Sequence, residues 1–176
     1  SSLENLPQSA VIPVLRRRDG SLWALTRAGL ARFDGRRLAL ILPFPAFFDS
    51  EVNCFHEASD GSLWFGTGHD GAYRYDGKSL SRLGVEHGLP SDQIQAVVET
   101  SDGALWFGTP AGLSKFNGVT VLNYTEKDGF ITPGLASIQV DEDDVLWCAA
   151  GPAGICRFDP YSFTRFTGRD GLVNEV

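Results

Sequence analysis

The chain has 176 residues, of which 43% are hydrophobic, so it can bury a core and we expect a single domain. Its 22 acidic residues against 15 lysines and arginines give a formal net charge of −7. This acidic balance argues against nucleic-acid binding, because such an interface rewards a basic surface. There is no run of 18 apolar residues, so we expect no direct membrane insertion.

The first predicted unit, approximately residues 6–46, introduces the features that later units repeat. An Asp-Gly pair at residues 19–20 precedes an apolar run that contains Trp23. Asp and Gly tolerate the positive φ of a tight hairpin, so the pair predicts a turn between two strands. Three arginines, residues 16–18, form the one basic run of the chain, and we interpret them as an exposed approach to this turn.

The second predicted unit, approximately residues 47–88, carries the motif most clearly, as Asp-Gly-Ser-Leu-Trp-Phe-Gly-Thr over residues 60–67. Its entry loop is aromatic, and Phe44, Phe47 and Phe48 could either stack on a sugar ring or seal the loop onto the sheet. After the motif, His69 and Asp70 stand where the third unit has Pro and Ala. We therefore expect a polar turn at this position.

The third predicted unit, approximately residues 89–129, resolves into four short strands. The predicted strands cover residues 94–99, 105–109, 113–116 and 121–125, with Gly-containing turns between them. The second strand is apolar on both faces, as expected where other sheets cover both of its sides. This unit is the template for the other three.

The fourth predicted unit, approximately residues 130–171, departs from the motif, and residues 172–176 begin a fifth copy. Asp144 replaces the turn glycine, and Asp is a residue that also enters the left-handed conformation. Cys148 takes the place of a core phenylalanine, whereas Cys156 is expected on the opposite face one strand later, so we expect no bridge between them. The three cysteines show no metal-ligand spacing.

The four tryptophans are separated by 41, 42 and 41 residues, and several other columns keep the same spacing. A repeat of four short strands with this period is typical of a propeller blade. We therefore predict an all-β fold, a β-propeller segment of four four-stranded antiparallel blades within a larger propeller of seven or eight blades. The equivalent core residues between the blades are predicted to be Trp23, Trp64, Trp106 and Trp147. Because the chain lacks methionine, we expect it to be a piece of a longer protein.

The motif resembles the two-component regulator propeller repeat, whose pattern is Asp-Gly-x-Leu-Trp-Phe-Gly-Thr followed by Gly-Leu-x-Arg-Phe and Asp-Gly-Leu-Pro. These elements appear at residues 60–67, 29–33 and, with His in place of Asp, 87–90. The resemblance implies the sensor region of a bacterial inner-membrane signalling protein, periplasmic or otherwise extracytoplasmic and often glycan-responsive. It also implies an output region, a histidine kinase or a diguanylate cyclase, further along the parent chain.

A ligand of a propeller usually sits at the mouth of the central channel, where the loops of several blades converge. Blade connectivity places the loops between blades and the loops between second and third strands at one end. We expect a small molecule or an oligosaccharide to bind there. The predicted ligand-binding residues are Phe48, Asp49, Glu51, His69, Asp70, Asp92 and Gln93.

Catalysis needs a base, a nucleophile and a group that orients the base. The three histidines fall in different columns of the repeat, and the acidic residues 141–144 lack the spacing of a calcium loop. We therefore expect no catalytic residue, no metal and no cofactor. Two other roles stay open: a scaffold for protein association, and a propeller lyase, which would require a catalytic histidine near a metal. The expected structural partners are further blades of the parent chain or a second copy in a homodimer.

Overall fold

The computed structural model describes residues 12–26, 28–44, 51–130, 135–150, 154–159 and 162–172, which form four antiparallel sheets of four strands. Each sheet uses four consecutive strands in sequence order. The first sheet contains β1 (Ile12–Arg16), β2 (Leu22–Thr26), β3 (Gly29–Phe33) and β4 (Leu38–Pro43), and the second contains β5 (Val52–Glu57), β6 (Leu63–Thr67), β7 (Ala72–Tyr75) and β8 (Leu80–Leu83).

The third and fourth sheets repeat this plan. The third contains β9 (Ala96–Glu99), β10 (Leu105–Thr109), β11 (Gly112–Phe116) and β12 (Val121–Tyr124), and the fourth contains β13 (Ser137–Val140), β14 (Leu146–Ala149), β15 (Ile155–Asp159) and β16 (Ser162–Phe166). Three short 3₁₀ turns follow the last strands of the second, third and fourth sheets: η1 (Val85–His87), η2 (Glu126–Asp128) and η4 (Gly168–Asp170). The predicted all-β fold and its four four-stranded units are confirmed.

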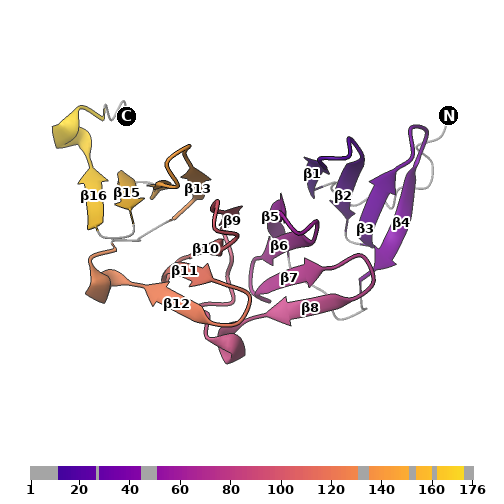
Figure 1. The fold of residues 1–176 in the computed structure, drawn as a ribbon, viewed down its shortest axis with the longest axis horizontal. Coiled ribbons are helices and arrows are strands. Elements are labelled where there is room, and N and C mark those ends of the chain that lie inside the picture. The colour runs from indigo at the N-terminus through magenta and orange to yellow at the C-terminus, as the bar shows by residue number, and fades with distance from the viewer. Residues whose placement is uncertain are drawn as a thin grey trace.

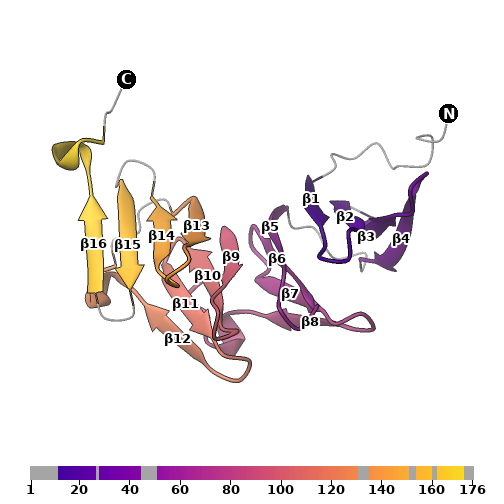
Figure 2. The ribbon, with the colours of Figure 1, turned by 45° about the horizontal axis from the view of Figure 1, so that its top comes forward.

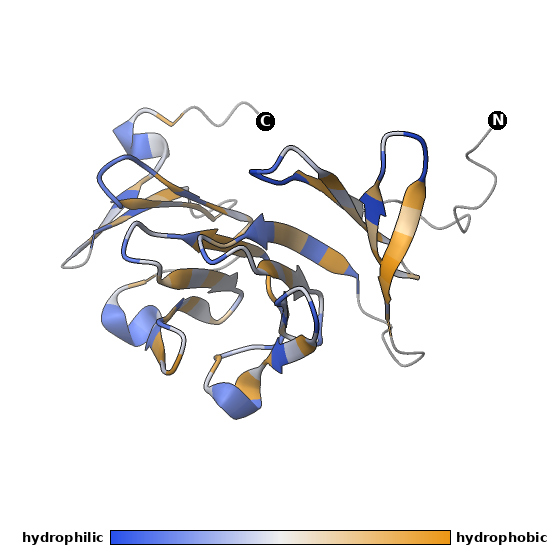
Figure 3. Cartoon of the chain, turned by 45° about the vertical axis from the view of Figure 1, so that its right-hand side comes forward, coloured by the Kyte–Doolittle hydropathy of each residue, from blue (hydrophilic) through white to orange (hydrophobic). Residues whose placement is uncertain are grey.

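The sheets follow one another along an open arc (Figures 1 and 2). The first strands of neighbouring sheets adjoin, β1 next to β5, β5 next to β9, and β9 next to β13, while the fourth strands lie at the outer rim. This is the arrangement of consecutive blades around a propeller axis. Hydrophobic residues follow the strands and hydrophilic residues gather in the turns, so the core lies between the sheets (Figure 3).

The third sheet matches its predicted strands to within two residues, and the largest difference is at its start. β9 begins at Ala96 rather than at Ile94. The backbone N–H of Ile94 instead donates to the carbonyl of Thr67 in the second sheet, at 2.8 Å. The residues that enter the third sheet are therefore attached to the preceding sheet before they join their own.

Three of the four motif tryptophans, Trp23, Trp64 and Trp106, are buried, and each packs against a ring of the next sheet. Trp147 differs from them because its side chain is only half-buried. It stacks on Phe166 of its own sheet, with ring centroids 6.0 Å apart. The repeat makes the four positions equivalent in sequence, but a neighbouring sheet covers only the first three.

The cysteines of the fourth sheet correct one expectation from the sequence. Cys148 and Cys156 are direct partners across β14 and β15, and residues directly opposite each other share a face of the sheet. The expected placement on opposite faces is therefore wrong. Both are free thiols in the core between the third and fourth sheets. Burial raises the pKa of Cys148 to about 12.

Asp144 adopts a left-handed conformation with φ of 60°, as the sequence predicted for a substitute of the turn glycine. It is the one residue other than glycine with positive φ in the described ranges. No helix in those ranges is long and apolar enough to cross a membrane.

Candidate functional site

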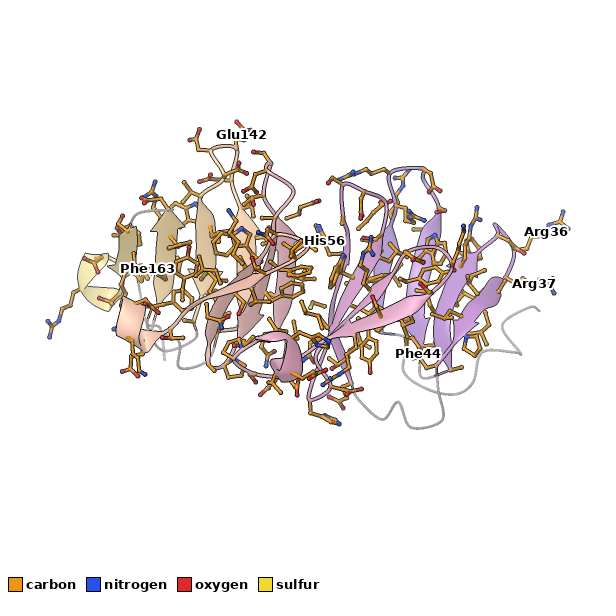
Figure 4. The ribbon with its side chains drawn as sticks, turned by 60° about the horizontal axis from the view of Figure 1, so that its bottom comes forward. Arg36, Arg37, Phe44, His56, Glu142 and Phe163 are labelled. Atoms are coloured by element: carbon orange, nitrogen blue, oxygen red, sulfur yellow. The ribbon has the colours of Figure 1, made fainter. Side chains whose placement is uncertain are left out.

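The predicted ligand-binding residues do not form one cluster. Phe48 and Asp49 lie outside the described residues. Glu51, His69 and Gln93 are exposed. Phe44, offered by the sequence as a stacking residue, instead packs against Phe65 with ring centroids 5.4 Å apart (Figure 4).

Two of the predicted residues, Asp70 and Asp92, are brought together by an arginine that sequence reasoning missed. Asp70 lies in the turn between β6 and β7, and Asp92 lies in the connection from β8 to β9. The Nη2 atom of Arg82, on β8, is 3.0 Å from the Asp92 carboxylate, and its Nε atom is 3.3 Å from the Asp70 carboxylate. The one signal in the sequence for this arginine was the acidic residue in each loop, because two carboxylates that lie close together are usually neutralised by a cation.

The same guanidinium also pairs with Glu86 at the start of the connection to the third sheet. Burial by itself would lower the pKa of Arg82, but hydrogen bonding to Glu86 and the charges of Asp92, Glu86 and Asp70 outweigh it and raise the pKa. The Asp92 carboxylate also accepts the backbone N–H of Val85 at 3.0 Å. This network fixes the loop of the second sheet against the connection to the third.

Next to this network, a groove of about 710 Å³ runs between the second and third sheets. Polar side chains and apolar surfaces alternate around it. Its polar lining includes Asp60, Arg74, Ser81, Arg82, His87 and Asn117, and its apolar lining includes Trp64, Leu83, Leu105, Phe116 and Val119.

Arg74 provides a positioned cation on one wall of the groove. Its Nη2 atom donates to Asp60 at 2.9 Å, and about two fifths of its side chain is exposed (38%). Burial by itself would raise the pKa of Asp60, but hydrogen bonds from Ser62 and Arg74 outweigh it and lower the pKa. The Asp60 carboxylate is therefore ionised near neutral pH. Together, Arg74 and Asp60 offer both donors and acceptors to a polar ligand.

A second hollow, of about 530 Å³, lies on the inner side of the arc along β5, β9 and β13. His56 and Glu99 line it, with 3.8 Å between Nε2 of the histidine and Oε2 of the carboxylate. The Nε2 atom is buried and has no hydrogen-bond partner, and burial lowers the pKa of His56 (Figure 4). This histidine is therefore neutral near pH 7.

Two further kinds of chemistry, metal binding and proton transfer, depend on which ionisable side chains lie together. Within the described ranges, no group of three or more His, Cys, Asp and Glu residues could hold a metal ion. The Glu99 carboxylate is occupied by two hydrogen bonds from Ser59, at 2.7 and 2.6 Å. The groove between the second and third sheets, with its several donors and acceptors, suits binding better than proton transfer.

Four consecutive antiparallel blades in an arc define this chain as a β-propeller segment. The family model for the two component regulator propeller matches residues 46–69 and 88–111. These two stretches of the chain are therefore similar to the two-component regulator propeller repeat. No curated protein matches it.

Solved propellers share the fold at low sequence identity. The extracellular domain of the hybrid two-component system BT3049 from B. thetaiotaomicron superposes with a TM-score of 0.80 at 19% identity, over 94% of this chain and 24% of that one. An inactive H270A virginiamycin B lyase from Staphylococcus aureus gives 0.75 at 16% identity, over 93% and 58%. PorZ, a surface component of the type-IX secretion system of Porphyromonas gingivalis, gives 0.71 at 15%, over 96% and 29%. This chain thus spans about a quarter of the first of these structures.

Proposed function

We propose that this chain is a ligand-sensing, non-catalytic segment of a bacterial signal-transduction receptor, located outside the inner membrane, and that its ligand is an oligosaccharide. The observation that carries the proposal is the groove between the second and third sheets. Ligand sites in proteins combine apolar walls with a few positioned polar groups, and this groove has both.

The groove offers the kinds of contact that a sugar requires. Arg74 and Ser81 present hydrogen-bonding groups to hydroxyls, and Phe116 presents an aromatic surface on the opposite wall. Because Arg82 is held by three carboxylates, the end of the groove is preorganised and little side-chain entropy is lost on binding. A ligand there would contact side chains of both the second and the third sheets. This shared contact is a route by which a sensor could transmit occupancy.

The similar proteins support the same class of function. Residues 46–69 and 88–111 match the two component regulator propeller, and the similar BT3049 structure is the extracellular domain of a hybrid two-component system. The fold is also shared by a lyase, so an enzymatic role is the competing hypothesis. We favour sensing because the groove has the larger set of binding groups, and His56 lines the inner hollow rather than this groove, although Glu99 borders both.

A second candidate role is association with other propeller blades or proteins. The observation that favours it is the first sheet, whose Val14, Phe33 and Leu40 are exposed. This role does not exclude ligand binding, because the exposed face lies at one end of the arc and the groove in its middle.

Calorimetry with a panel of neutral and acidic oligosaccharides tests the proposal. We expect wild type to bind one class, and Ser81→Trp to abolish binding by filling the groove. The matched control is Thr164→Trp, because Thr164 faces Arg157 in the fourth sheet as Ser81 faces Arg74 in the second. Phe48→Ala tests the alternative site at the mouth. No binding by wild type, or turnover of a bound glycan, would remove the proposed function.

A further inference from the structure

The junction between the third and fourth sheets is filled by a cluster of aromatic rings. Phe158 on β15 and Phe163 on β16 are stacked, with ring centroids 4.3 Å apart (Figure 4). The ring of Tyr124 lies 4.8 Å from that of Phe158 and stacks on Trp106 at 5.7 Å. These separations lie in the favourable range for aromatic pairs. Phe158 is covered as a result and is only 3% exposed.

The junction between the second and third sheets has aliphatic side chains at two of these positions. Val121 is the direct cross-strand partner of Phe116, and it stands where the junction between the third and fourth sheets has Phe163. Leu83, the last residue of β8, stands where that junction has Tyr124, the last residue of β12. Two rings are thus replaced by smaller side chains. The groove of about 710 Å³, which Leu83 and Phe116 line, lies at this junction.

Phe116 is the aromatic side chain that these replacements leave accessible. Its contact with the tryptophan of the preceding sheet is kept, because its ring lies 5.9 Å from that of Trp64, as the ring of Phe158 lies 5.4 Å from that of Trp106. Phe116 is nevertheless half-buried, whereas Phe158 is buried. The difference is the missing pair of neighbouring rings. Phe116 therefore offers an aromatic surface on which the ring of a ligand can stack.

The charges of the groove favour a ring without a charge of its own. The two arginines among its described lining residues are already paired, Arg74 with Asp60 and Arg82 with three carboxylates. An anionic sugar would meet the carboxylates of Asp60 and Glu99, and like charges brought together in a binding site oppose binding. Hydroxyl groups meet no such cost. A guanidinium has five N–H donors, so Arg74 can donate to a hydroxyl while Asp60 accepts from another.

We propose that an uncharged pyranose ring of the ligand stacks on Phe116, in the place that Phe163 and Tyr124 fill at the junction between the third and fourth sheets. The C–H bonds on one face of the pyranose pack against the aromatic face, and its hydroxyls point toward Arg74 and Asp60. Leu83 sets the specificity, because a larger side chain there would fill the space for the ring.

This inference rests on the proposed function and adds three features to it. They are the aromatic side chain that holds the sugar, the residue that leaves room for it, and the absence of charge on the bound ring. The nearby junction between the third and fourth sheets shows that rings fit at these positions of the repeat, since Tyr124, Phe158 and Phe163 pack there within one cluster.

Calorimetry with neutral and acidic sugars tests the inference. The neutral set is maltohexaose, cellohexaose, xylohexaose and mannohexaose, and the acidic set is hexagalacturonate and a heparin hexasaccharide. Wild type is expected to bind a member of the neutral set and neither acidic sugar. Phe116→Leu should raise the dissociation constant by about two- to tenfold, because an aromatic contact is lost, and Phe116→Tyr should leave it unchanged. Leu83→Tyr, which introduces the side chain of Tyr124, should abolish binding.

The matched control is Leu122→Tyr, because Leu122 is 55% exposed and lines a different hollow, so the added ring should leave binding unchanged. Circular dichroism verifies the fold of each variant, and the two Phe116 variants decide the question if Leu83→Tyr does not fold. A wild type that binds only acidic sugars, or a Phe116→Leu protein that binds as wild type does, would overturn the inference and leave the proposed function standing. A wild type that binds no sugar would overturn both.

Discussion

The carboxylate of Asp144 accepts the backbone N–H of Ser101 at 2.8 Å, across the junction between the third and fourth sheets. At the two preceding junctions the equivalent bond comes from Glu57 and Glu99, but the fourth sheet has Val140 at that position. Asp144 replaces the lost glutamate from the hairpin itself. This explains why an aspartate stands where the other hairpins have a left-handed glycine.

This replacement can be tested by moving the carboxylate back. Asp144→Gly should lower the free energy of unfolding by about 1 kcal/mol, because losing hydrogen bonds to a charged group costs about 1.5–3 kcal/mol and relief of the left-handed backbone returns about 1 kcal/mol. Adding Val140→Glu should restore the lost stability, because it returns a glutamate to the position of Glu57 and Glu99. Urea denaturation measures both variants. An Asp144→Gly protein more stable than wild type would show that the hydrogen bond from Ser101 to Asp144 does not stabilise the fold.

The tryptophans should differ in their contribution to stability according to their neighbours. Trp64→Ala is expected to lower the free energy of unfolding by about 3–5 kcal/mol, because it leaves a cavity between two sheets. Trp147→Ala should cost only about 1–2 kcal/mol, because its side chain is half-buried. Equal losses in denaturant titrations would show that the fourth tryptophan is covered after all.

We expect that a side chain at Gly108, the glycine of the third-sheet motif, destabilises the protein. A Cβ atom on Gly108 would lie 2.3 Å from Cδ2 of Leu135 and 2.8 Å from Cδ1 of Ile138. Gly108→Ala should therefore destabilise the protein by about 1–3 kcal/mol through overpacking. Gly168→Ala is the control, since a Cβ atom there would have no neighbour within 4 Å, and its effect should stay within about 0.5 kcal/mol. A neutral Gly108→Ala variant would mean that the ends of the Leu135 and Ile138 side chains move aside at no cost.

The hairpin carboxylates should titrate below their ordinary range. Hydrogen bonds from Lys115 and then Thr100 lower the pKa of Asp102 to about 2. A lowered carboxyl pKa stabilises the folded state above the ordinary value of 3.8, and this contribution is lost as the pH falls from that value through about 2. Carbon-detected NMR of the Asp102 carboxyl should show the low midpoint, and Lys115→Met should move it upward. An unchanged midpoint in that variant would exclude the lysine as the cause.

The sequence by itself determined the repeat, the strands and the turns. The spacing of Trp64 and Trp106 and the Asp-Gly hairpins sufficed for this, because strand alternation and positive φ are local properties of the chain. The prediction of a left-handed Asp144 succeeded for the same reason.

Only the tertiary structure decided which of the repeated residues are covered and which polar residues meet. Arg82 joins Asp70 to Asp92 although the two aspartates are 22 positions apart in the chain. The shared face of Cys148 and Cys156 depends on the register between two strands, which the sequence spacing did not reveal. Trp147 has the same sequence context as the three buried tryptophans, but its side chain is only half-buried. Burial at this position requires an adjoining sheet, and a repeat motif encodes only the sheet to which it belongs.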